Sequence, residues 1–117
     1  MAISEAQAGR LEQKANDARD SAEIAGDEVA MLERLLDARK SANPSESEAL
    51  DAQLERARRR QTSAVARYEE LARDCEERVS GFKRKPLETG KHSVTVQHVE
   101  QREYFERNTA ASLAARN

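Results

Sequence analysis

The chain has 117 residues, of which 36% are charged and 3% are aromatic, with no tryptophan and a net charge of −2. This composition is typical of long helices and coiled coils, and it leaves little apolar material for the concave pocket that most enzymes need. The small net charge gives no general attraction to nucleic acids or anionic membranes. We therefore expect one all-α domain with no catalytic residues, no cofactor, no metal and no membrane partner.

A heptad-like pattern of small and apolar residues predicts a first helix over about residues 4–41. Ser4 and Gln7 have the spacing of a capping box, which marks where this helix begins. Steps of three and four separate the residues of its apolar seam, which are Ala8, Leu11, Ala15, Ala18, Ala22, Ala25, Val29, Leu32 and Leu36.

A second helix is predicted over about residues 44–83 by a series with the same steps. Asn43 is a good N-cap, Pro44 suits the first helical position, and Pro86 stops the helix. Its seam residues are Leu50, Leu54, Ala57, Gln61, Ala64, Tyr68, Leu71, Cys75, Arg78 and Phe82. Because the polar turn between the two helices is short, they form an antiparallel coiled-coil hairpin over residues 1–84.

The register of this hairpin follows from placing Leu36 opposite Leu50. Each seam residue of one helix then faces a seam residue of the other, and small residues of the first helix meet large ones of the second. Three charge pairs beside the seam agree with this register, namely Lys14 with Asp74, Glu28 with Arg60, and Glu33 with Arg58. Exposed pairs of this kind contribute only about 0–1 kcal/mol each, so they indicate register more than stability.

The pattern changes after the hairpin, where residues 85–99 read as a linker with an extended end. Apolar and polar residues alternate over residues 92–99, which predicts a short β-strand. One strand has no partner within this chain, so it must pair with another chain, dock as an extended segment or remain disordered. Residues 100–117 regain helix propensity and predict a short C-terminal helix or tail.

Apolar residues beside the seam are the strongest hint of function. A two-helix hairpin buries one stripe on each helix, so a second stripe indicates that something else packs there. A second hairpin, the chain's own tail and a foreign protein are the three candidates. The predicted partner-binding residues are Ile24, Met31, Leu35, Val65, Val79, Val94, Val96, Tyr104 and Phe105.

Basic residues suggest an alternative function in nucleic-acid binding. Residues 82–117 carry a net charge of +3, which leaves −5 for the hairpin. The candidate phosphate contacts are Lys83, Arg84, Lys85 and Lys91, which follow the second helix. A short basic cluster after a helix also complements the helix dipole, so a structural role competes with this one.

The remaining reactive side chains favour structural roles. Cys75 lies on the seam and is expected to be a buried thiol, while His92 and His98 have no defined third ligand for a metal. A single cysteine makes a reducing cytoplasm the default location, and no apolar run reaches the roughly 20 residues of a membrane span.

The sequence therefore predicts a non-enzymatic protein that acts through protein–protein contact. It would be a subunit, scaffold, adaptor or inhibitor in a larger complex, such as a virion or a secretion apparatus. We expect it to form a homo-oligomer or a larger protein assembly, in the cytoplasm or in a particle built after cytoplasmic synthesis.

Overall fold

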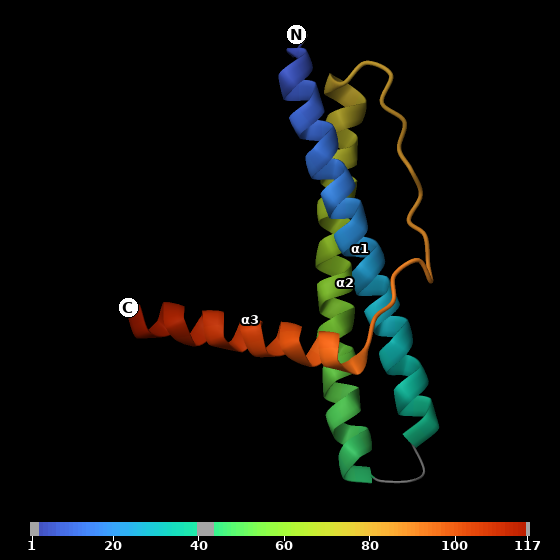
Figure 1. The fold of residues 1–117 in the computed structure, drawn as a ribbon, viewed down its shortest axis with the longest axis vertical. Helices are drawn as coiled ribbons and strands as arrows, with labels where there is room; N and C mark the ends of the chain where they lie inside the picture. The colour runs from blue at the N-terminus through green and yellow to red at the C-terminus, as the bar shows by residue number, and fades with distance from the viewer. Residues whose placement is uncertain (1–2, 40–43, 117) are drawn as a thin grey trace.

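Two long helices packed as an antiparallel hairpin form the body of the protein, and a third helix extends away from it (Figure 1). The computed structural model describes residues 3–39 and 44–116. Its helices are α1 (Glu5–Arg39), α2 (Pro44–Arg78) and α3 (Val96–Arg116). The described molecule measures 58 × 39 × 18 Å. The predicted all-α class and the helical hairpin are confirmed.

Both hairpin helices begin where the sequence predicted, and α2 ends earlier. Ser4 and Gln7 form the predicted capping box, with the Gln7 amide 3.2 Å from Ser4 Oγ and the Ser4 amide 3.1 Å from Gln7 Oε1. The predicted turn lies largely outside the described residues, although Pro44 does begin α2. α2 ends at Arg78 instead of residue 83, because Gly81 adopts a φ of +78° that continues no helix.

Three apolar clusters lie along the seam between α1 and α2, and two of them group residues that the predicted register pairs, Leu32 with Leu54 and Ala18 with Tyr68. The cluster nearest the turn joins Leu32 to Leu54 and Ala57, and the cluster at the opposite end joins Ala15 to Cys75. Two predicted charge pairs are confirmed, Glu28–Arg60 at 3.8 Å and Glu33–Arg58 at 3.6 Å. The third differs, since Asp74 pairs with Arg78 of its own helix at 3.5 Å.

The segment between α2 and α3 runs back along α1 without regular structure (Figure 1). The prediction of a β-strand over residues 92–99 is wrong, because α3 begins at Val96 and the described residues contain no strand. Thr95 caps α3, with its Oγ1 3.2 Å from the His98 amide. Val94 and Val99 pack against the same apolar cluster, and their spacing around this cap is that of a hydrophobic staple.

α3 packs against the hairpin mainly through its first two turns and then leaves it sideways, with Glu106 of the third turn still 3.6 Å from Arg60 (Figure 1). Val99 and Glu103 are buried at 1% and 5% exposure, whereas residues 104–112 are all exposed. We call residues 104–112 the α3 arm. The short tail helix that the sequence predicted from residue 100 is thus a longer helix that is docked mainly through its root.

Candidate functional site

Three acidic side chains in the middle of α1 are buried, although the apolar seam uses none of them. Glu23, Asp27 and Glu28 are 2%, 7% and 0% exposed. A buried carboxylate is costly unless hydrogen bonds and opposite charges compensate for lost water. Most of that compensation comes from residues 86–102, so these acids attach the tail to the hairpin.

Arg19, Glu23 and Asp27 stand four residues apart on one face of α1, and we call them the α1 ladder. Each binds the backbone of the linker as it passes. Arg19 donates to the Pro86 carbonyl at 3.2 and 3.3 Å, Glu23 accepts from the Glu88 amide at 2.8 Å, and Asp27 accepts from the amides of Gly90 at 2.7 Å and His92 at 3.0 Å. The ladder therefore holds an extended peptide by its main chain.

Glu23 is surrounded by positive groups as well as by this amide. Its carboxylate lies 3.4 Å from Arg19 Nη2, 3.5 Å from Lys91 Nζ and 3.3 Å from His92 Nε2. Burial by itself raises the pKa of Glu23, but the Glu88 amide, His92 and the two cations outweigh it and hold this pKa below its usual value. Glu23 is therefore ionised at neutral pH.

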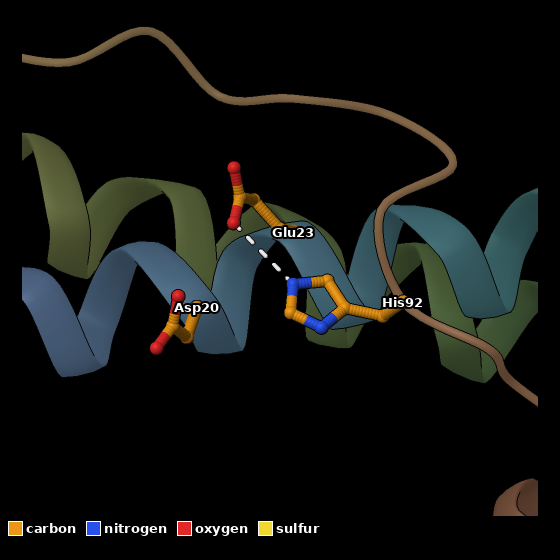
Figure 2. Close-up of side chains that lie close together, drawn as sticks. All are labelled: Asp20, Glu23 and His92. Atoms are coloured by element: carbon orange, nitrogen blue, oxygen red, sulfur yellow. Dashed lines mark hydrogen bonds and ion pairs between the residues drawn. The ribbon is translucent and has the colours of Figure 1, made fainter.

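Asp20, Glu23 and His92 form a group of three side chains whose donor atoms lie within 4.8 Å of one another. Figure 2 shows the His92 ring of the linker turned toward Glu23, with Asp20 on the preceding turn of α1. A histidine and two carboxylates are donors that zinc accepts. Arg19 and Lys91, however, already neutralise the Glu23 carboxylate. The group fits an ion-pair clamp on the linker better than a metal centre.

Glu28 is the fully buried acid at the root of α3. Its Oε1 lies 3.1 Å from Arg102 Nη1 and 3.2 Å from His98 Nε2, and its Oε2 lies 3.8 Å from Arg60 Nη2. Two of these partners are on α3 and one is on α2. Glu28 therefore joins all three helices at a single point.

A second ion pair holds the other side of the root. Glu103 of α3 accepts two hydrogen bonds at 3.0 Å from the Arg56 guanidinium of α2. Arg60 Nη1 lies 3.8 Å from the same carboxylate and 3.6 Å from Glu106. The hydrogen bonds with Glu103 raise the pKa of Arg56. Planar two-point pairing of this kind fixes direction, so it sets the angle at which α3 leaves the hairpin.

The α3 arm begins with two exposed aromatic side chains. Tyr104 and Phe105 are 61% and 67% exposed, and their rings meet edge to face with centroids 6.0 Å apart. A hollow of about 650 Å³ beside Phe105 is lined by α3 residues alone. Because no second element closes it, this hollow is an open helix face and not an enclosed substrate cavity.

The predicted partner-binding residues differ in how deeply the structure buries them. Met31 and Val79 are buried in the core, while Leu35, Val65 and Val94 are partly buried against it. Ile24 is half-buried, and Val96, Tyr104 and Phe105 are exposed. The chain's own tail thus covers part of the α1 stripe, through Val94 and Val99 and not through the aromatic pair.

The predicted basic residues do not form one free patch. Arg84 pairs with Glu69 and Glu76 of α2, and Lys91 lies against Glu23. Lys83 and Lys85 are exposed. The Lys85 carbonyl accepts a hydrogen bond of 2.6 Å from the hydroxyl of buried Tyr68, which fixes the start of the linker.

Cys75 is fully buried in the seam, as the sequence predicted. Burial raises the pKa of its thiol, and the negative charges of Asp74 and Glu12 raise it further. The thiol is therefore protonated at neutral pH and is a packing residue.

Comparison with models of known protein families, with curated proteins and with solved structures finds no match to this chain.

Among the described helices, none combines the length and the apolar character needed to cross a bilayer.

Proposed function

We propose that this protein is a non-enzymatic assembly protein that associates with copies of itself through the α3 arm. One observation carries the proposal. In the described part of the chain, the large hydrophobic side chains that stand exposed are Val96, Tyr104 and Phe105, and all three belong to α3. Exposed aromatics on an otherwise polar surface are typical of binding hot spots.

The arm has a shape that a second arm can complement. One to two turns beyond the aromatic pair, Ala110 and Ala111 are exposed and small. Two α3 helices packed antiparallel would place the rings of one over the alanines of the other, which allows close approach. The ion pairs of the buried acids Glu28 and Glu103 hold the root in one direction, so the arm loses less freedom on binding than a flexible tail would.

The nucleic-acid alternative has less support. Of its four candidate residues, Arg84 and Lys91 already pair with carboxylates of the hairpin. Lys83 and Lys85 alone give too few phosphate contacts for binding that survives physiological salt. Binding to DNA or RNA that strengthened steeply as the salt concentration fell would favour this alternative over the proposal.

The test is the solution mass from light scattering over a concentration series of the full chain. We expect a mass above 13.1 kDa that rises with concentration for the wild type. Tyr104→Ala combined with Phe105→Ala is expected to restore the monomer. Ile24→Ala is the matched control, because it trims a half-buried residue of the hairpin stripe. A monomeric wild type, or association that the double variant leaves intact, would overturn the proposal.

A further inference from the structure

The α1 ladder and the linker match in their repeat lengths. Four residues of an α-helix rise about 6 Å, and two residues of an extended chain advance about 6.6 Å. The linker residues that the ladder holds are Pro86, Glu88, Gly90 and His92, which are two residues apart. Arg19, Glu23 and Asp27 therefore meet Pro86, Glu88 and Gly90 of a peptide that runs parallel to α1. At Gly90, whose φ is +74°, the chain turns, and the His92 amide reaches the same Asp27 carboxylate.

This recognition uses backbone atoms, so it does not depend on most side chains of the bound peptide. One carbonyl and three amides make the hydrogen bonds, while Glu88 and Gly90 are exposed. Side-chain selection comes from Lys91 and His92, which contact Glu23, and further along from Val94 on the apolar cluster. The hairpin thus carries a docking site for one extended segment of defined register.

We infer that this docking site also takes the tail of a second copy, so that two molecules exchange residues 86–103. A second copy supplies the same carbonyl, the same amides and the same tail partners for Glu23 and Glu28, so the contacts of residues 86–103 are kept on exchange. The exchanged tail leaves its own hairpin at residues 85–86, directly after the Lys85 carbonyl that Tyr68 of that hairpin holds. Exchange is thus a way of linking hairpins that does not use Tyr104 or Phe105.

Mass action sets the conditions for observing exchange. A tail on a short linker competes for its own hairpin at an effective concentration in the millimolar range. Exchange between wild-type chains is therefore a minor event in dilute solution. If one chain has a defective ladder and the other a defective tail, neither tail can dock on its own hairpin. The intact tail of the first chain then binds the intact hairpin of the second.

The experiment mixes two full-length variants with complementary defects. One carries Glu23→Ala and Asp27→Ala, so its hairpin lacks the ladder acids while its tail is intact. The other carries Glu88→Pro and Gly90→Pro, so its tail lacks two of the donating amides while its hairpin is intact. Circular dichroism of each variant alone establishes that α1 and α2 remain helical.

The readouts are native mass spectrometry and hydrogen exchange of the Gly90 and His92 amides. We expect the intact tail of the ladder-deficient variant to be unprotected alone and to gain at least tenfold protection on mixing, together with a one-to-one complex. A mixture that behaves as the sum of its two components would overturn the inference. Adding Tyr104→Ala and Phe105→Ala to both chains should leave this complex intact, which separates exchange from association through the arm.

If either variant loses its helical hairpin, chains with an intact ladder and an intact linker provide the test. Two differently tagged preparations are unfolded together, refolded at about 1 mM and captured through one tag. Exchanged pairs would carry both tags after dilution. Both preparations also carry Tyr104→Ala and Phe105→Ala, so that association through the α3 arm does not bring the two tags together. Capture of a single tag from these chains, or of both tags when Glu88→Pro and Gly90→Pro are added, would overturn the inference.

Discussion

The seam of the hairpin is an apolar interface, whereas the interface between the hairpin and the tail is largely polar and charged. The seam buries alanine, leucine and cysteine between α1 and α2, whereas the tail is held largely through Glu23, Asp27, Glu28 and Glu103. Burying apolar side chains stabilises the fold in proportion to the area buried. The attraction within a buried ion pair, by contrast, exceeds only slightly the cost of removing its charges from water. The difference teaches that the hairpin supplies stability and the tail interface supplies direction. We therefore expect the tail to detach before the hairpin unfolds.

The largest expected effect is a loss of stability when a seam residue is replaced. Leu54→Ala removes a side chain that is 4% exposed and should lower the free energy of unfolding by about 2–5 kcal/mol. Urea unfolding followed by circular dichroism measures this. Arg59→Ala, on the exposed face of α2, is the control and should change little. A cost below about 1 kcal/mol for Leu54→Ala would contradict the importance of the seam.

A smaller effect is expected where the two interfaces meet. Val99 is 1% exposed and joins the root of α3 to the apolar cluster of the hairpin. Val99→Ala removes part of the roughly 1.5–3 kcal/mol that burying a valine provides. We expect faster hydrogen exchange at the Glu88 and Gly90 amides with little change in the hairpin. Equal acceleration at seam amides would show that tail and hairpin unfold together.

The pH dependence of tail attachment sharpens the comparison further. The pKa of Glu23 is lowered in the folded protein, so its contribution is present above the unfolded pKa near 4.5 and is lost as pH falls through the lower, folded pKa. The amide resonance of Glu88, whose N–H donates to the Glu23 carboxylate, should therefore shift in acid, below pH 4.5. Glu23→Gln should weaken attachment at neutral pH and remove this transition. An unchanged transition in that variant would assign it to another acid.

The smallest expected effect concerns metal. Because Arg19 and Lys91 neutralise Glu23, zinc at ten equivalents should leave the thermal unfolding midpoint within about 1 °C of the metal-free value. The same titration on Lys91→Ala is the informative comparison, since removing that cation frees one carboxylate oxygen. A large stabilisation of the wild type would mean that Asp20, Glu23 and His92 bind the ion.

The hairpin and the tail also differ in how well the sequence predicts them. The hairpin was readable because a seam of period 3.5 and a capping box are local patterns that a single sequence displays. The start of α3 was missed because Val94, Val96 and His98 alternate as in a strand. The staple formed by Val94 and Val99 around Thr95 was the signal that could have corrected it. Helix boundaries depend on such caps more than on propensity.

The α1 ladder could not be read from the sequence in the same way. Arg19, Glu23 and Asp27 look like an ordinary solvated face of a helix, because i,i+4 charges are common on exposed helices. Their partners are main-chain groups more than 60 residues away, and backbone donors leave no mark in composition. The buried hydroxyl of Tyr68 was a better clue, since such a group usually requires an acceptor.

The short root of α3 makes the rest of that helix a lever. Its pivot lies at Glu28 and Glu103, and the part beyond the pivot, from Glu103 to Arg116, is about 20 Å long at 1.5 Å per residue. A tilt of about 10° at the pivot would therefore sweep the far end through about 3–4 Å. Small rearrangements of the charged side chains at the pivot would thus move the far end of α3 by about the distance between two atoms in contact.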